Sequence, residues 1–279
     1  MLALSPSVGF IWEPFNRQHR PGICRARFDQ WFPYVCDTNA SLYEDDIRAC
    51  LEFRYGLAAE LKSVRSPIDI ARLARDFVIF TKNRVLKKRA LQKDPIAVFS
   101  AAWLATRFEM DVVVLIRHPA AFAGSLKAAD WTFPFEHLLQ QPLLMEQHLA
   151  NYRNEIELQV RNQGDIIDQS ILLWNVTHHV ILKYKTEHSD WHFLRHEDIS
   201  SDPVEEYRKL YGKLGLAFSP KIESQIVHHS SGEKPAFLNR DSKSNISTWK
   251  NRLTAAEIDR IRDGTLELAQ QFYTDDSWQ

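Results

Sequence analysis

Residues 111–119 read Asp-Val-Val-Val-Leu-Ile-Arg-His-Pro and contain an uninterrupted apolar run from Val112 to Ile116. The apolar residues do not alternate with polar ones, which is typical of a strand in a parallel sheet whose two faces are both covered. Arg117 ends the run. Pro119 suits the first turn of a following helix, where the amide hydrogen that proline lacks is not needed. The stretch therefore predicts a central strand followed by a helix over about 119–129.

Further strands and helices alternate on both sides of this stretch. Short strands are predicted at 8–12, 90–93 and 191–194, with a long loop at 16–41. Helices are predicted at about 43–61, 96–108, 136–161, 166–187, 202–214 and 255–273. Two of these helices carry start signals, Asp202-Pro203 and the capping box formed by Thr254 and Glu257. Strands that alternate with helices predict an α/β fold with a mainly parallel sheet flanked by helices. Without a repeat or a linker, one domain over residues 1–279 is expected.

Composition and charge exclude several classes of protein. The chain has 279 residues, of which 44% are apolar and 25% charged, as in ordinary globular proteins. Thirty-five Lys and Arg against 36 Asp and Glu leave a net charge of −1, which argues against binding nucleic acid through bulk charge. No apolar run reaches the roughly 18 residues that a membrane span needs, and the N-terminus lacks the pattern of a signal peptide. A cytoplasmic location is therefore expected.

Cysteine and histidine positions do not predict a metal site. The three cysteines, Cys24, Cys36 and Cys50, are odd in number and lack C-x-x-C spacing, so disulfide scaffolds and zinc ribbons fit poorly. The histidines at 188, 192 and 196 have helical spacing, but 191–194 is predicted as a strand, which would place them on different faces. No metal cofactor is expected.

Charged residues follow each predicted strand. Glu13 follows the first strand, Lys93 and Asp94 the second, Arg117 the third, and residues 195–198 the fourth. Because ligands bind beyond the carboxyl ends of open parallel sheets, these charges are candidates for a site at one edge, and the cations suit an anionic ligand. The alternative is that charges cluster where strands leave the core. The run from Lys82 to Lys93 has the same two interpretations, an anion-attracting surface or a solvated face.

Two separate motifs resemble the PAPS-dependent sulfotransferase family, where PAPS is 3′-phosphoadenosine-5′-phosphosulfate. Residues 113–125 are similar to the family's segment for the 3′-phosphate: an apolar strand, then Arg117, a polar residue, a proline, and Ser125 eight residues after the arginine. Residues 242–254 are similar to its C-terminal cofactor loop, with matches at Lys243, Trp249, Lys250, Asn251 and Thr254. Ser242 and Ser244 stand where the family has Arg and Gly, and Arg240 could substitute at a different spacing. Residues 193–216 also resemble the family's late strand and helix.

The resemblance implies a fold and a set of roles. It implies a three-layer, P-loop NTPase-like α/β domain with PAPS as co-substrate and no metal. Glu13 falls where many relatives carry the general base, and Lys93 resembles a lysine beside the transferred sulfuryl group. Arg117, Ser125, Lys243, Trp249 and Lys250 would bind the cofactor. The expected reaction is transfer of a sulfuryl group to a hydroxyl or amine of a small-molecule or saccharide acceptor, by analogy with in-line phosphoryl transfer.

The family's Gly/Ser/Thr-rich loop, which cradles the 5′-phosphosulfate, has no counterpart in the sequence. Residues 1–6 resemble the end of the helix that follows this loop, so the first and central strand of the family sheet is also expected to be missing. Met1 would then be an internal residue of a longer protein. Alternatively, the chain is a degenerate, non-catalytic relative that acts as a binding or interaction protein. A nucleotide kinase of related fold is disfavoured by the Trp-Lys-Asn loop at 249–251.

Overall fold

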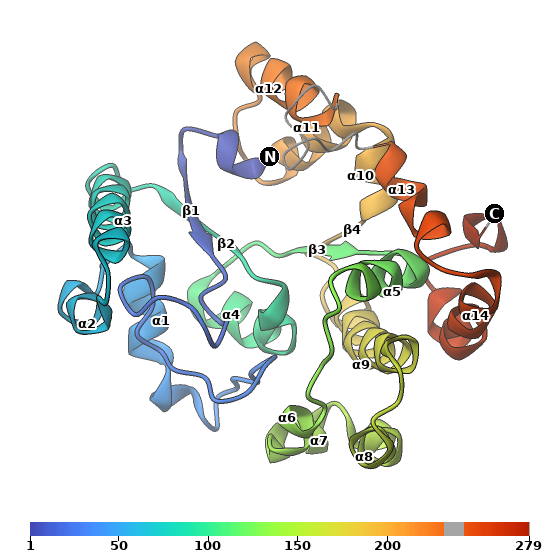
Figure 1. The fold of residues 1–279 in the computed structure, drawn as a ribbon. Helices are drawn as coiled ribbons and strands as arrows, with labels where there is room; N and C mark the ends of the chain where they lie inside the picture. Colours follow the sequence, from blue (N-terminus) through green and yellow to red (C-terminus); the bar gives the residue numbers. More distant parts are fainter. Residues whose placement is uncertain (232–242, 279) are drawn as a thin grey trace. The chain divides into compact units, whose positions relative to one another are not determined.

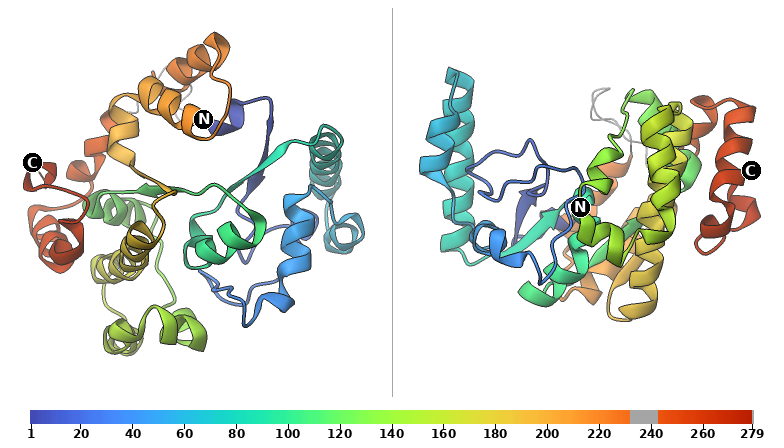
Figure 2. Two further views of the ribbon diagram at one scale, coloured as in Figure 1. Left: turned by 180° about the vertical axis from the view of Figure 1, so that it is seen from behind. Right: turned by 90° about the horizontal axis from the view of Figure 1, so that it is seen from below.

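The computed structural model describes residues 1–231 and 243–278 (Figures 1 and 2). They form an α/β structure of helices and short parallel strands. Contacts group the chain into two compact units, residues 2–110 and residues 111–279 together with Met1. Each unit contains one pair of parallel strands. The assignment of residues 1–279 to one domain stays a prediction.

The first unit is built on β1 (Val8–Trp12), which pairs in parallel with β2 (Arg89–Lys93). The register places Trp12 beside Lys93, so both strands end at the same edge. The strand expected at 8–12 is confirmed, but it is buried on one face only. Phe10 and Trp12 are 37% and 57% exposed, while Ile11, pointing the other way, lies in the core.

The connection between β1 and β2 carries η2 (Ala40–Leu42), α1 (Glu44–Leu51), α2 (Leu57–Ser63) and α3 (Pro67–Val85). The single helix expected over about 43–61 is wrong, because the chain breaks between α1 and α2. Phe53 adopts a left-handed backbone conformation (φ 55°), which a continuing helix does not allow, and Gly56 precedes the second helix. After β2 come η3 (Pro95–Ser100) and α4 (Ala101–Phe108), so the helical stretch expected at 96–108 begins as a 3₁₀ helix. A short 3₁₀ turn, η1 (Leu2–Leu4), precedes β1.

The second unit is built on β3 (Val113–Ile116), which pairs in parallel with β4 (His192–Arg195). Both strands lie where the sequence predicts them. The prediction that both faces of β3 are covered is wrong for the described residues, because the Leu115 side chain is 54% exposed. Apolar runs do not reveal which face of a strand its neighbours leave open, so this difference could not be read from the sequence.

Three helices pack on one another in the second unit: α5 (Pro119–Ala128), α9 (Ile166–Glu187) and α14 (Ala255–Ala269). All three were predicted, with α14 ending four residues earlier than expected. The helix expected over 136–161 is instead divided into α6 (Glu136–Leu139), α7 (Pro142–Gln147), η4 (Ala150–Tyr152) and α8 (Arg153–Asn162). Pro142 explains the first break, since it cannot continue a helix and keeps Gln141 out of the helical conformation (φ −114°, ψ 82°).

The second unit contains further helical elements. They are α10 (His196–Ser201), α11 (Pro203–Lys213), α12 (Pro220–Ser230), α13 (Ser244–Ser247), η5 (Thr248–Asn251) and η6 (Asp275–Trp278). Asp202 caps α11 and Thr254 forms the expected capping box with Glu257, so both predicted start signals are confirmed. None of the helices in residues 1–231 and 243–278 combines the length and apolar character needed to cross a membrane.

Candidate functional site

The start of α5 holds the residues expected to bind the 3′-phosphate. Arg117 follows β3 directly, and its carbonyl accepts a hydrogen bond from Trp174 Nε1 at 3.0 Å. Ser125 lies two turns into the helix and donates its hydroxyl hydrogen to the carbonyl of Ala121 at 3.0 Å. A helix N-terminus presents amide hydrogens and a positive dipole end. The guanidinium, the helix start and the hydroxyl therefore lie along one short segment that suits an anion.

His118 caps this helix and is held from several sides. Its Nδ1 accepts a hydrogen bond from the amide of Ala120 at 3.3 Å, so the ring proton is on Nε2. Burial lowers the pKa of His118 to about 4, so the ring is neutral at neutral pH. The His118 amide donates to Glu197 Oε1 at 3.1 Å, and the Tyr273 hydroxyl donates to Glu197 Oε2 at 2.9 Å. The carboxylate after β4 thus ties the start of α5 to the C-terminal part of the unit.

The structure brings the two family-like motifs into contact. The ring of Trp249, on η5, stacks on His118 with centroids 5.5 Å apart and an interplanar angle of 16°. On the helix itself, a Cβ added at Gly124 would lie 3.3 Å from Trp249 Cβ and 3.4 Å from its Cα. Glycine therefore permits the close approach of η5 to α5. Residues 113–125 and 243–254, more than 100 positions apart in sequence, form one local structure.

A salt bridge also links the last turn of α5 to the first turn of α14. Lys127 Nζ lies 2.7 Å from each carboxylate oxygen of Glu257, the residue that completes the capping box of α14. The lysine and this box lower the pKa of the Glu257 carboxyl. The sequence predicts Glu257 as part of a helix cap but carries no signal for its pairing with Lys127.

The cofactor loop residues occupy different environments. Trp249 is 4% exposed and packs with apolar residues of α5, α9 and α14, so it lies inside the unit. Lys250 Nζ lies 5.5 Å from the Trp249 ring centroid, and Lys243 directly precedes α13. Arg240 and Ser242 lie outside the described residues. The cofactor-binding roles of Lys243, Trp249 and Lys250 stay predictions.

In the first unit, the ends of β1 and β2 bring Glu13 and Lys93 together. Lys93 Nζ lies 2.5 Å from Glu13 Oε1 and 4.4 Å from the ring centroid of Trp12. The Glu13 side chain is 14% exposed and that of Lys93 46% exposed, so the carboxylate is the more enclosed partner. Asn16 Nδ2 donates to the second carboxylate oxygen at 3.2 Å. The structure thus brings together two of the strand-end charges expected at one edge, and the roles of Glu13 and Lys93 stay predictions.

The backbone at Glu13 is fixed in an unusual conformation. Its φ of 42° is left-handed, which costs a residue with a side chain roughly 1–2 kcal/mol. Two hydrogen bonds hold it there, from the Glu13 amide to the Lys93 carbonyl and from the Asn16 amide to the Glu13 carbonyl, each 3.0 Å. Such conformations persist where the surroundings determine them, frequently at functional sites.

Asp94 is a half-buried carboxyl next to Lys93 in sequence. It accepts hydrogen bonds from the amides of Phe15 at 2.7 Å and Ile96 at 3.1 Å. Burial raises the pKa of Asp94 to about 6, and the charge of Glu13 adds to this effect. Asp94 therefore fixes the turn that carries Glu13 as well as the start of η3.

The seven predicted site residues thus form two groups, Glu13 with Lys93 in the first unit and the cofactor residues in the second. Sequence reasoning missed His118 and Glu197 as supports of α5, although both follow predicted strands. The sequence gave no sign that position 124 requires glycine, because that requirement comes from the contact with the distant Trp249. Among residues 1–231 and 243–278, no group of three or more His, Cys, Asp or Glu side chains is placed to hold a metal ion.

Comparison with known proteins gives partial matches to sulfotransferases. No family model matches. The chain is 32% identical to carbohydrate sulfotransferase 5 of Mus musculus over 88 residues, 28% of this chain and 22% of that protein. It is 31% identical to carbohydrate sulfotransferase 2 of Mus musculus and of Homo sapiens over 84 residues, 26% of this chain and 16% of those proteins. The match thus spans less than a quarter of the length of these relatives. It establishes homology to sulfotransferases over about a quarter of the chain.

One solved structure with similarity is the sulfotransferase domain from the curacin biosynthetic pathway. It is 13% identical in sequence and aligns with a TM-score of 0.44, covering 96% of this chain and 97% of that one.

Proposed function

We propose that this protein is a sulfotransferase that transfers a sulfuryl group from PAPS to a hydroxyl or amine of an acceptor, with a saccharide as the leading acceptor class. The observation that carries the proposal is the junction of residues 113–125 with residues 243–254 around α5. The homology to carbohydrate sulfotransferases supports the same reaction class. In this proposal the fold is three-layered and P-loop NTPase-like.

The 3′-phosphate of PAPS would bind at the start of α5. Arg117 supplies a guanidinium that can form two parallel hydrogen bonds to a phosphate, and the helix N-terminus adds its dipole. Ser125 would turn its hydroxyl from the Ala121 carbonyl toward the ligand. Lys243 and Lys250 would add positive charge from the cofactor loop.

Glu13 and Lys93 would act on the reacting groups. Glu13 takes the proton of the acceptor hydroxyl as its oxygen attacks sulfur. The bond from sulfur to the oxygen of the 5′-phosphate breaks, which leaves the sulfated acceptor and adenosine 3′,5′-bisphosphate. Lys93 would stabilise negative charge on the sulfuryl oxygens, since its ammonium lies beside the base. His118 is the second candidate for the base.

Binding of adenosine 3′,5′-bisphosphate by calorimetry tests the cofactor site. Losing a charged partner of a bound anion costs roughly 2–5 kcal/mol. We therefore expect Arg117→Ala to weaken binding at least about tenfold, which corresponds to about 1.4 kcal/mol. Arg208→Ala is the control, because Arg208 lies on α11 in the same unit and pairs with Glu205 and Glu223.

Unchanged affinity in Arg117→Ala would contradict the assignment of the 3′-phosphate site. Binding of the bisphosphate without sulfuryl transfer to any acceptor would favour the alternative, a non-catalytic relative that binds the nucleotide.

A further inference from the structure

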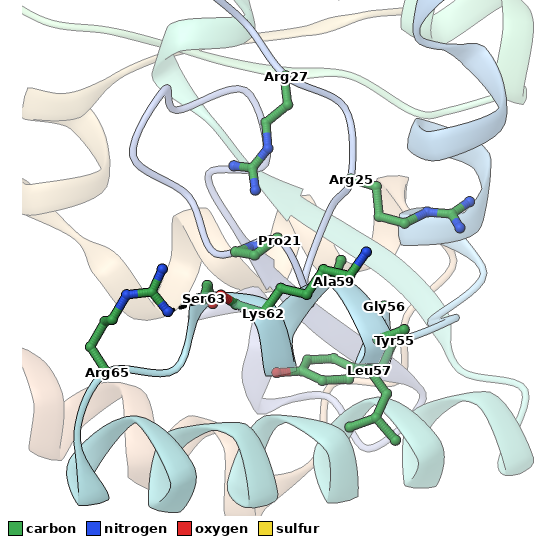
Figure 3. A pocket seen from close by; sticks show the side chains of 11 residues that line it. Pro21, Arg25, Arg27, Tyr55, Gly56, Leu57, Ala59, Lys62, Ser63 and Arg65 are labelled. Carbon is green, nitrogen blue, oxygen red and sulfur yellow. Dashed lines mark hydrogen bonds between the residues drawn. The ribbon is translucent and has the colours of Figure 1, made fainter.

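A cavity of about 810 Å³ lies in the first unit between α2 and the loop that precedes α1 (Figure 3). Its volume falls within the range of about 300–1,000 Å³ that small-molecule sites occupy. No part of the proposed reaction uses it. The residues that line it are Pro21, Arg25, Arg27, Tyr55, Gly56, Leu57, Ala58, Ala59, Lys62, Ser63 and Arg65.

The lining is strongly basic. It contains four cationic side chains and, among the described residues that form it, no carboxylate. Arg25 is neutralised by Asp46 at 2.8 Å. Arg27 donates to the backbone carbonyl of His19 at 3.4 Å, and Arg65 donates to the carbonyls of Lys62 and Val64 at 3.0 Å each. Backbone carbonyls carry no net charge, so these two guanidinium groups remain positive.

Lys62 is the third positive side chain of the cavity, with Arg27 and Arg65, that no carboxylate of the described residues neutralises. In the described part of the chain its ammonium has no ion-pair partner. Figure 3 shows Arg27 on the loop above α2 and Arg65 just beyond the end of α2, while the Lys62 side chain extends from α2 on the side away from Arg65. Three positive charges around one cavity focus a field that attracts anions.

A buried network fixes the walls of the cavity. Glu60, 2% exposed, accepts hydrogen bonds from Arg20 Nε and from the Gly22 amide, each at 2.7 Å. Both of its oxygens are used beneath the surface, so Glu60 does not neutralise the cavity. Arg20 also pairs with Asp76 on α3 at 2.6 Å. The loop and α2 are thereby held together, and the cavity is built into the unit.

Apart from the hydroxyls of Tyr55 and Ser63, the remaining side chains of the lining are apolar and suit a sugar rather than a base. Pro21, Leu57, Ala58 and Ala59 offer surface for the C–H faces of a saccharide ring. Tyr55 is the one aromatic residue among the described lining residues. Its ring packs edge-on against Phe77 and Phe80, and a Cβ at Gly22 would lie 2.3 Å from its Cζ. These contacts engage the Tyr55 ring within the unit, and a single aromatic ring is a poor platform for the stacking of successive bases on which single-stranded nucleic acid binding relies.

We propose that this cavity binds an anionic saccharide, one that carries carboxylate or sulfate groups, as a part of the acceptor beyond the sugar that is modified. The proposal rests on the proposed sulfotransferase function. Arg27, Lys62 and Arg65 would bind the acidic groups through charge-assisted hydrogen bonds, and the apolar wall would pack against the ring.

Calorimetry on the full chain tests this with a sulfated, uronic-acid-containing tetrasaccharide, a neutral tetrasaccharide and a DNA tetranucleotide as probes. We expect the sulfated probe to bind more tightly than the other two. The double variant Lys62→Gln/Arg65→Gln should weaken its binding at least about tenfold. The matched control, Lys82→Gln/Arg84→Gln, removes the same two charges from the exposed end of α3 and should change the affinity less than about twofold.

Equal losses in both double variants, or tighter binding of the DNA, would overturn the proposal. Affinity for adenosine 3′,5′-bisphosphate is measured on the same samples. Binding of the bisphosphate shows that the protein is folded, and it tests the proposed function independently of the saccharide probes. A protein that binds the bisphosphate but not the sulfated probe overturns the cavity assignment and leaves the proposed function standing. A protein that binds the sulfated probe through Lys62 and Arg65 but not the bisphosphate contradicts the proposed function and supports the cavity as a saccharide site.

Discussion

Gly124 offers a sharp test of the junction between α5 and the cofactor loop. It lies in the interior of α5, where glycine normally costs about 0.5–1 kcal/mol relative to alanine. A Cβ at this position would lie 3.3 Å from Trp249 Cβ and 3.7 Å from Arg252 Cβ, so the glycine serves the packing of η5 rather than the helix.

The size of the added side chain decides the outcome. For Gly124→Ala, the gain in helix propensity offsets one tight contact, so we expect a change in unfolding free energy within about 0.5 kcal/mol. For Gly124→Val, the two γ-carbons extend beyond a Cβ that already touches Trp249. Overpacking of this kind costs about 1–3 kcal/mol. Because Trp249 stacks on His118, which caps α5, the displacement also reaches the proposed 3′-phosphate site.

Urea unfolding and calorimetry with adenosine 3′,5′-bisphosphate measure the two effects. Gly212, on α11 of the same unit, is the matched control, since no atom lies within 4 Å of an added Cβ there. Gly212→Val should be close to neutral, and Gly124→Val should be less stable by about 1–3 kcal/mol and bind the bisphosphate more weakly. Equal stability of the two valine variants, with unchanged nucleotide affinity, would refute the close packing of η5 on α5.

Three further predictions concern Glu13, Asp94 and His118. Glu13→Gln should lower turnover about 10²–10⁴-fold while bisphosphate affinity stays near wild type; turnover within a few-fold would mean that another group is the base. Burial raises the pKa of Asp94 to about 6 from its ordinary 3.8, so the native state binds this proton more tightly and stability falls as pH rises from about 4 to about 6. Asp94→Asn should flatten that part of the urea-unfolding profile, and an unchanged slope would contradict the raised pKa. His118→Ala should cost at least the 0.5–2 kcal/mol of a helix cap, whereas His118→Asn should retain the cap and part of that stability; equal losses on thermal unfolding would argue against capping.

Local sequence signals predicted most of the secondary structure. The start of α5 at Pro119, the cap at Asp202 and the capping box at Thr254 all depend on residues within three or four positions of one another, so they can be recognised from spacing. The same logic should have found α3 and α12, which were missed. Each begins with Ser-Pro, and the side chains of Ser66 and Ser219 accept the capping hydrogen bonds.

Breaks within predicted helices were harder to place. Pro142 is a recognisable stop signal, but the prediction of one long helix over 136–161 did not take it into account. The break near Phe53 contains no proline, and its one local signal, Gly56, stands three residues further on. The aromatic side chain is 3% exposed and packs edge-on against Phe80 on α3, and burial in the core accompanies the left-handed backbone. Tertiary packing overrides local preference there.

The sequence by itself determined which residue types stand at the strand ends and at the start of α5, because strand and helix periods fix where each element stops. The sequence also showed that two separate segments, residues 113–125 and residues 243–254, both resemble the sulfotransferase family. Only the tertiary structure decided that Gly124 lies against Trp249, that Lys127 pairs with Glu257, and that Lys62 and Arg65 border one cavity. Such contacts depend on the path of the chain between distant segments, and many paths are compatible with the same local pattern of charge and hydrophobicity.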